Sequence, residues 1–306
     1  MKHLLSVCDM KDQVMDLLDL ADSYKAGKIR EKVLEDMTLA MIFEKSSTRT
    51  RVSFEVGASQ MGAQPLYLSA SDLQLGRGEP IADTARTLSR YVDGIMIRAI
   101  RHTDVIELAE NASVPVINGL TDLEHPCQAL ADMQTVREKK GGFDGTLVFV
   151  GDGNNVCNSL LIITSILGMD MRVACPEGYE PDPGIVAKAK KIAEETGSQI
   201  RILHDPEEAV RGADVVYTDV WVSMGYEDEA ENRMKVFRPY QVNSGLMDIA
   251  GDDAIFMHCL PAIRGQETTS EVIDGPRSVV WDQAENRLHA QKAIMHWLLT
   301  GKIQDW

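Results

Sequence analysis

The stretch from Phe43 to Arg51, FEKSSTRTR, combines hydroxyl and guanidinium groups at one point of the chain. A short apolar run precedes it and apolar residues at helical spacing follow it, so a buried strand is predicted to turn into a helix here. Ser46, Ser47 and Thr48 are favoured N-cap residues. A helix start has unpaired N–H groups and a partial positive charge, and Arg49 adds a fork suited to phosphate. The pattern therefore predicts an anion site, although a capped helix with solvated arginines is the alternative.

Two further polar groups follow predicted strands in the first half of the chain. His125 and Gln128, in the sequence HPCQ, fall on the first turn of a predicted helix. Their donors suit a carbonyl oxygen that gains negative charge, whereas the alternative is an ordinary helix cap. Arg98 ends the apolar run GIMIR, where its side chain either binds an anion or forms an ion pair at the surface.

Two clusters occupy the second half. Asp219 and Ser223 follow the apolar run VVY, in TDVWVSMG, and a carboxylate there suits a substrate ammonium or caps the next segment. Cys259 ends a predicted strand in FMHCLP, where a thiol is either reactive or simply buried. The turn GDGNNV (151–156) resembles a dinucleotide-binding loop but lacks its third glycine.

These groups need a frame of strands and helices, and the sequence alternates between the two. The fold class predicted is α/β: two doubly wound domains with parallel sheets, joined by linking helices, with the active site in the crevice between them. The charged, glycine-rich turn REKKGGFDG marks the expected boundary, which gives domains at 1–140 and 141–283. An amphipathic helix at 284–303 is expected to pack back on the first domain. Asp9 is the expected N-cap of the first helix.

Composition excludes several classes of function. The 306 residues carry a net charge of −16, which argues against general binding to nucleic acid or anionic membranes. Five scattered cysteines without a C-x-x-C pair argue against a disulfide scaffold or a zinc site. The N-terminus lacks an export signal, and no apolar run reaches the roughly 20 residues of a membrane span. A cytoplasmic protein is expected.

Taken together, FEKSSTRTR, Arg98, HPCQALAD, WVSMG and HCLPA resemble the aspartate/ornithine carbamoyltransferase family over essentially the whole chain. The first and third are similar to its carbamoyl-phosphate signatures, and the last two to those of its ornithine branch. The resemblance implies that 1–140 binds carbamoyl phosphate and 141–283 binds ornithine. The implied reaction transfers the carbamoyl group to the δ-amine of L-ornithine, giving L-citrulline and phosphate. It needs no metal or organic cofactor.

The resemblance also implies a role for each matching residue. Catalytic roles fall to Arg98, His125, Cys259 and Arg287. The residues implied to bind carbamoyl phosphate are Ser47, Thr48, Arg49, Thr50, Gln74, Arg98, His125, Gln128, Cys259, Leu260 and Arg287. Those implied to bind ornithine are Asn155, Asp219, Ser223 and Met224. Gln74 is expected to act on a neighbouring subunit, since the family forms trimers, or multiples of trimers, with shared active sites.

Three other interpretations remain open at this point. A related carbamoyltransferase would use putrescine, aspartate or an acylated ornithine, although Asp219 would repel the second carboxylate of aspartate. An NAD-dependent oxidoreductase would use the GDGNN turn. A non-catalytic subunit would bind carbamoyl phosphate or a partner.

Overall fold

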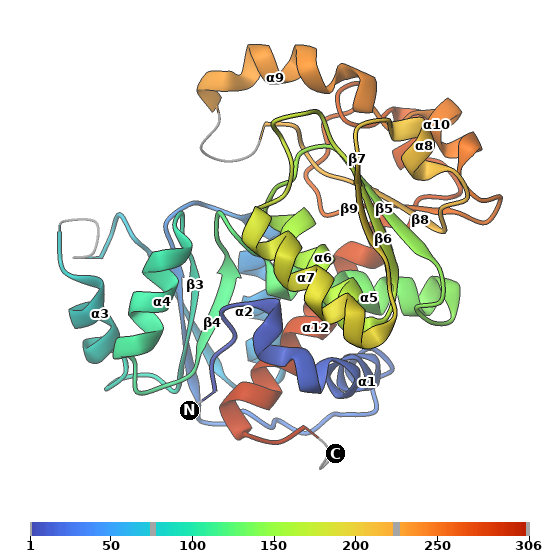
Figure 1. Cartoon of the computed structure of the whole chain (residues 1–306). Coiled ribbons are helices and arrows are strands. Elements are labelled where there is room, and N and C mark those ends of the chain that lie inside the picture. Colours follow the sequence, from blue (N-terminus) through green and yellow to red (C-terminus); the bar gives the residue numbers. More distant parts are fainter. Residues whose placement is uncertain (1, 74–77, 223–226, 304–306) are drawn as a thin grey trace. The chain divides into compact units, whose positions relative to one another are not determined.

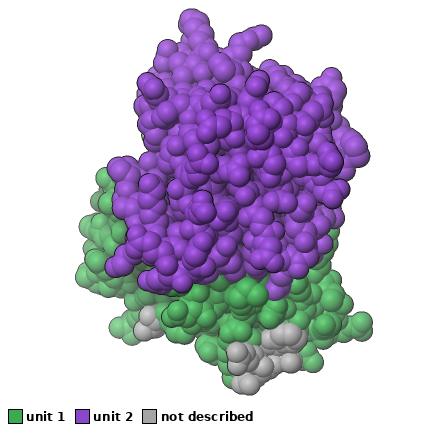
Figure 2. All heavy atoms as spheres, turned by 45° about the vertical axis from the view of Figure 1, so that its right-hand side comes forward, with its two compact units in different colours: residues 1–134, 285–306 green, residues 135–284 purple. Residues whose placement is uncertain are grey.

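The computed structural model describes residues 2–73, 78–222 and 227–303. The chain forms two compact units (Figure 2): unit 1 comprises residues 1–134 and 285–306, and unit 2 comprises residues 135–284. Each unit contains one parallel β-sheet with helices, so the predicted α/β fold class with two parallel sheets is confirmed. Two helices cross from one unit into the other along the chain: α5 (Pro126–Lys140) and α12 (Val280–Thr300).

Unit 1 is built on a four-stranded sheet in the order β2-β1-β3-β4. Its strands are β1 (Thr38–Phe43), β2 (Gln64–Ser69), β3 (Gly94–Arg98) and β4 (Val116–Leu120). Its remaining helices are η1 (Val7–Gln13), α1 (Val14–Lys25), α2 (Thr48–Gln60), α3 (Ile81–Leu88) and α4 (His102–Asn111). Helices α3 and α4 lie side by side against the sheet (Figure 1), and their apolar residues form one core with those of β1 and β3.

The first helical segment starts earlier than the sequence pattern indicates. Ser6, and not Asp9, is the N-cap of η1, and its hydroxyl accepts a hydrogen bond from the Cys8 N–H. Asp9 is the third residue of this short helix, and its carboxylate accepts from the Ser6 N–H. Ser6 and Asp9 thus form a capping box. Serine and aspartate are both common N-cap residues, so residue preference alone did not show which of the two is the N-cap.

Unit 2 is built on a five-stranded sheet in the order β7-β6-β5-β8-β9. The strands are β5 (Thr146–Val150), β6 (Asp170–Ala174), β7 (Ile200–Leu203), β8 (Val215–Thr218) and β9 (Ile255–His258). The helices are α6 (Asn155–Leu167), α7 (Pro183–Thr196), α8 (Pro206–Val210), η3 (Glu227–Glu229), α9 (Ala230–Phe237), η4 (Arg238–Tyr240), α10 (Ser244–Ile249) and α11 (Ser270–Ile273). Apolar residues of α8, α10 and α11 pack on one face of the sheet.

The strand order determines where polar side chains meet. Within each unit all strands run parallel, so their carboxyl ends share one edge of the sheet. In unit 1 this edge carries the start of α2 after β1, Arg98 at the end of β3, and the start of α5 after β4. In unit 2 it carries the turn after β5, Asp219 after β8 and Cys259 after β9.

Among the described residues, no helix combines the length and apolarity that crossing a membrane requires.

Candidate active site

The start of α2 is shaped by its N-cap and by the neighbouring strand. Ser47 is extended (φ −154°, ψ 117°), and its hydroxyl accepts from the Thr50 N–H at 3.3 Å. Just before it, the Glu44 N–H donates to the Arg98 carbonyl at 3.0 Å, and the Glu44 carboxylate accepts from the Ile100 N–H at 2.6 Å. The exits of β1 and β3 are therefore held together, and the helix start faces the end of β3.

Two arginines far apart in the sequence converge on Thr50. Its hydroxyl, which is buried, accepts from Arg98 Nη1 and from Arg287 Nη2, both at 3.3 Å. Arg98 ends β3 and Arg287 belongs to α12. Two guanidinium groups beside a helix N-terminus are an arrangement that suits a doubly charged anion such as a phosphate group.

The first turn of α5 joins this cluster through Gln128. The Gln128 side-chain oxygen accepts from Arg287 Nη1 at 2.5 Å, and its Nε2 donates to Asp132 at 2.7 Å. Because Asp132 takes the amide N–H, Gln128 presents its oxygen to Arg287 and fixes that guanidinium. Gln128 and Arg287 are both nearly inaccessible to solvent.

His125 lies at the same place and is held in its neutral form. Burial lowers the pKa of His125 well below its ordinary value of 6.5, and the charges of Arg287 and Arg98 lower it further. A neutral imidazole donates one N–H without adding charge. The geometry therefore suits an uncharged donor directed at a carbonyl oxygen, between two permanent cations.

A buried carboxylate supports the start of α5. Glu124 accepts from the Ser6 hydroxyl at 2.7 Å and from the Val7 N–H at 2.8 Å. The Asn118 side chain on β4 donates to the Leu5 carbonyl at 2.8 Å. The N-terminal segment is thus tied to the loop that positions His125. Sequence reasoning missed this support, because the bonded residues lie more than 100 positions apart.

In unit 2, the carboxylate of Asp219 collects three donors. Asn154 Nδ2 donates to Oδ2 at 2.8 Å, while Oδ1 accepts from the Val220 N–H at 2.8 Å and from the Cys259 thiol at 3.1 Å. Asp219 follows β8, Cys259 follows β9 and Asn154 is the N-cap of α6. The arrangement presents a nearly buried carboxylate and a thiol together, which suits a substrate with cationic amines.

The backbone after Cys259 is fixed by a buried imidazole–carboxylate pair. His258 Nδ1 accepts from the Leu260 N–H at 2.9 Å, so its Nε2 carries the proton that it shares with Glu267 at 3.0 Å. Glu267 also accepts from the Ile263 N–H at 2.6 Å. Leu260 has a φ of 60°, a conformation that costs a residue with a side chain roughly 1–2 kcal/mol. These bonds hold it there.

Asp219, His258 and Cys259 offer three possible metal-ligand atoms within 4.8 Å of one another. Both ring nitrogens of His258 already take part in hydrogen bonds, to the Leu260 N–H and to Glu267. To bind a metal ion, His258 would have to give up one of these hydrogen bonds. The strained backbone at Leu260 would then lose a contact that stabilises it. The donor set therefore favours a hydrogen-bonded site over a metal centre.

The structure brings most of the sequence-predicted residues into two groups. Thr50, Arg98, His125, Gln128 and Arg287 meet in unit 1, with Ser47 as the helix cap. Asp219 and Cys259 meet in unit 2, with Leu260 next in the chain. Thr48 is exposed at the start of α2, and Arg49 is half-buried beside it. Gln74, Ser223 and Met224 lie outside the described residues.

One member of an asparagine pair was overlooked. Asn155, named by the family resemblance, is the first residue of α6, and the structure adds Asn154, whose side chain donates to Asp219. Asn154 Oδ1 also accepts from the Val156 and Cys157 N–H groups, as an N-cap does. An asparagine before an apolar helix is itself a cap signal, so the pattern contained a usable clue.

Comparisons with known proteins agree with this geometry. The chain combines two parallel α/β units, one with two guanidinium groups that converge on Thr50 and one with a carboxylate–thiol pair. The carbamoyl-P binding domain of aspartate/ornithine carbamoyltransferases matches residues 2–138, and the Asp/Orn binding domain matches residues 144–298. The chain belongs to the aspartate/ornithine carbamoyltransferase family, as its motifs predict.

Individual relatives are similar over nearly their whole length. The ornithine carbamoyltransferase of Methanothermobacter thermautotrophicus is 84% identical over 299 residues, which are 98% of this chain and 99% of the relative. The solved ornithine carbamoyltransferase of Pyrococcus furiosus has a TM-score of 0.95 at 56% identity, with 98% of both chains covered. The anabolic enzyme of Campylobacter jejuni has a TM-score of 0.94 at 42% identity, covering 99% of this chain and 100% of that one.

Proposed function

We propose that this protein is an ornithine carbamoyltransferase, which converts carbamoyl phosphate and L-ornithine into L-citrulline and phosphate. The observation that carries this proposal is the convergence of Arg98 and Arg287 on Thr50 at the start of α2. Sequence identities of 84% and 56% to two ornithine carbamoyltransferases, each over 98% of this chain, support the same substrate pair. The anabolic name of one solved relative favours the direction of citrulline synthesis.

Carbamoyl phosphate binds in unit 1 under this proposal. Its phosphate lies at the start of α2, against Ser47, Thr48, Arg49 and Thr50. Arg98 contacts both the phosphate and the carbamoyl oxygen, while His125, Gln128 and Arg287 contact the carbamoyl group. The hydrogen bonds that both guanidinium groups donate to Thr50 support this placement.

Ornithine binds in unit 2, with its α-amino group paired to Asp219. Asn155, Ser223 and Met224 contact the α-amino and α-carboxylate groups, and Cys259 and the Leu260 carbonyl lie near the δ-amine. Asp219 favours a cationic acceptor, because aspartate would bring a second carboxylate against it. An N-acylated ornithine lacks the charged α-amine, and putrescine lacks the α-carboxylate.

The reaction is a nucleophilic attack of the neutral δ-amine on the carbamoyl carbon. A tetrahedral intermediate forms, the C–O bond to phosphate breaks, and the amine loses a proton. Arg98, Arg287 and neutral His125 stabilise the negative charge that develops on the carbamoyl oxygen. Acceptors for the proton are the phosphate and the Asp219–Cys259 pair, whose thiol and carboxylate lie 3.1 Å apart.

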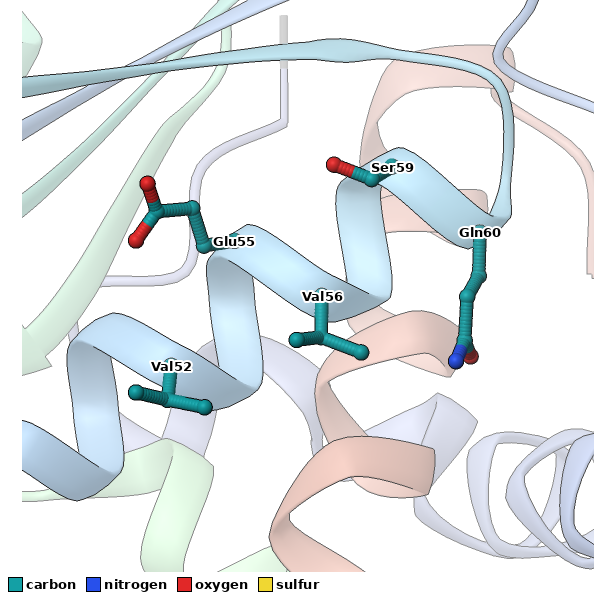
Figure 3. A pocket seen from close by; sticks show the side chains of 5 residues that line it. All are labelled: Val52, Glu55, Val56, Ser59 and Gln60. Atoms are coloured by element: carbon teal, nitrogen blue, oxygen red, sulfur yellow. The ribbon is translucent and has the colours of Figure 1, made fainter.

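We further propose that the protein assembles as a trimer, or a multiple of trimers, in which Gln74 completes the site of a neighbouring chain. An exposed apolar face on α2 supports assembly: Val52, Glu55, Val56, Ser59 and Gln60 line an open hollow of about 280 Å³ (Figure 3). Val52 is 49% exposed and Val56 38% exposed. The edge strand β2 adds Leu66, which is 39% exposed. Exposed apolar side chains that lie one helical turn apart, as Val52 and Val56 do, are a feature of interaction sites.

A competition assay tests the acceptor. The purified protein is supplied with carbamoyl phosphate and an equimolar mixture of ornithine, putrescine, aspartate and N-acetylornithine, and the products are separated by mass. Citrulline is the expected main product. Preferential use of another acceptor would contradict the roles of Asp219 and the ornithine site, and absence of any product would contradict catalysis.

A further inference from the structure

A buried arginine in α9 has no part in the chemistry proposed above. Arg233 is 4% exposed, and its Nη1 donates to Asp152 Oδ2 at 2.8 Å and to the Trp221 carbonyl at 3.1 Å. Its Nε donates to Glu229 at 3.1 Å. A charge is buried only where its partners offset the loss of water, so three acceptors on three segments indicate a built arrangement.

Aromatic rings hold the guanidinium in place. Its carbon lies 5.0 Å from the centre of the Tyr179 ring and 5.9 Å from that of Phe237. Phe237 stacks in turn on Trp221 with ring centres 6.2 Å apart. Rings at these distances attract a cation and restrict its position. The Trp221 carbonyl and the Arg233 guanidinium are therefore fixed by the same cluster.

Two of the three partners of Arg233, Asp152 and Trp221, belong to the segments that hold the Asp219 carboxylate. Asp152 is in the turn after β5, where the Asn154 N–H donates to the Asp152 carbonyl at 2.7 Å and Asn154 Nδ2 reaches Asp219. Trp221 lies two residues after Asp219 in the chain. One guanidinium thus ties the turn that carries Asn154 to the segment that carries Asp219.

Arg233 also separates like charges. Burial raises the pKa of Asp152, Arg233 lowers it, and the charges of Asp219 and Glu229 raise it, which together gives a pKa of about 6. Three carboxylates would repel one another without the cation among them. A change at Arg233 is therefore expected to move Asp219 as well as Asp152.

We infer that Arg233, acting with Asp152, is a positioning residue for the amino-acid substrate. It touches no reacting atom, and it holds Asp219 and Asn154 in the geometry that recognises the α-amino group of ornithine. This role rests on the proposed function. All the contacts that define it lie in unit 2, whereas the proposed carbamoyl-phosphate residues Thr50, Arg98 and Arg287 lie in unit 1. The effect is therefore specific to one substrate.

Arg233→Lys tests the inference, because lysine keeps the charge but lacks the planar fork that reaches several acceptors at once. The KM for ornithine is expected to rise roughly 10- to 100-fold while kcat changes less than about threefold, since misplacing a binding group acts on recognition. The dissociation constant of carbamoyl phosphate alone, from calorimetry, is expected to stay unchanged. Asp152→Asn, which keeps the side-chain shape, is expected to raise the same KM by a smaller factor.

Arg277→Lys is the matched control. Arg277 also lies in unit 2 and, like Arg233, bridges a carbonyl, that of Met247, and a carboxylate, that of Asp248, although it is more exposed and has one carboxylate partner where Arg233 has two. Its replacement is expected to leave the ornithine KM within about twofold of wild type, because it has no link to Asp219. Thermal unfolding of every variant confirms the fold, and Asp152→Asn decides the question if Arg233→Lys does not fold.

Two kinds of result would overturn the inference. An unchanged ornithine KM in folded Arg233→Lys, or in Asp152→Asn where that variant decides, would show that the contacts do not position the substrate. An equal rise in Arg277→Lys, or a parallel loss of carbamoyl-phosphate binding, would show a general structural defect. Wild-type protein without activity on ornithine would overturn the proposed function itself, and that outcome is visible before any variant is made.

Discussion

At the scale of single residues, the site in unit 1 is defined by permanent charges around groups that stay neutral. Arg98 and Arg287 both donate to the Thr50 hydroxyl, and their charges, together with burial, depress the pKa of His125. Guanidinium groups keep their charge at any pH at which the protein folds. The electrostatic field at the site is therefore independent of pH over the range in which a free histidine would titrate.

His125 is expected to act as a neutral donor, so its removal should lower the rate without changing the pH profile. Its pKa in the folded protein lies below the ordinary 6.5, so the imidazole is uncharged at pH 6.5 and above. Replacing His125 by Ala is expected to lower kcat about 10²- to 10³-fold, as loss of one such donor does. His125→Gln, which keeps a neutral N–H donor, is expected to recover part of that loss.

The pH profiles of kcat distinguish this role from proton transfer. If His125 stays neutral, the profile of His125→Gln between pH 6 and 9 keeps the apparent pKa values of the wild type. Loss of an acid limb near pH 6 to 7 in that variant would mean that His125 titrates during turnover. Such a result would contradict the neutral form in the structure.

At the scale of elements, the turn after β5 positions Asn154 by packing its backbone closely against the backbone of residues 179–181. The Gly153 N–H donates to the Tyr179 carbonyl at 3.0 Å, and the next residue, Asn154, caps α6 and contacts Asp219. A Cβ on Gly153 would lie 2.2 Å from the Pro181 nitrogen and 2.4 Å from the Glu180 carbonyl carbon. No side chain fits there unless the backbone moves.

Gly153→Ala is therefore expected to destabilise unit 2 and to weaken ornithine binding together. Forcing a methyl group into packed backbone costs about 1–3 kcal/mol, and the shift would move Asn154 away from Asp219. Gly142→Ala is the control, because a Cβ there meets nothing within 4 Å. Denaturant unfolding and the ornithine KM measure both effects. Equal behaviour of the two variants would contradict the close approach at Gly153.

Elements are also the scale at which the sequence was most informative. Alternating apolar runs and helical spacing predicted both parallel sheets, because buried strands and amphipathic helices leave distinct periods. Favoured cap residues identified the start of α2, where Ser47 is the N-cap. Asn155 came from the family resemblance, whereas the cap signal before the apolar helix α6 belongs to Asn154. Contacts such as His258 with Glu267 depend on tertiary structure, which no local pattern encodes.

At the scale of the whole molecule, the charge distribution opposes the binding of an anionic substrate. A net charge of −16 repels an anionic substrate, so binding depends on local guanidinium groups and helix termini. The sequence predicted such an anion site at the helix start in FEKSSTRTR, where Arg49 is one of the guanidinium groups. A different feature, the exposed valines of α2, supports the proposed assembly.

Mixing two inactive variants tests whether each site is shared between chains. Gln74→Ala removes the side chain proposed to act on a neighbour, and Arg98→Ala removes a residue of the receiving site. Each variant alone is expected to be nearly inactive. In mixed trimers, a site is complete only where a chain with intact Arg98 lies next to a neighbour with intact Gln74. When equal amounts assemble at random, each condition holds for half of the chains, so roughly one site in four is complete.

Activity of the reassembled mixture is therefore expected to rise to about one quarter of the wild-type activity. Activity no greater than the mean of the separate variants, from a mixture shown by native mass spectrometry to contain hybrids, would mean that each chain builds its site alone.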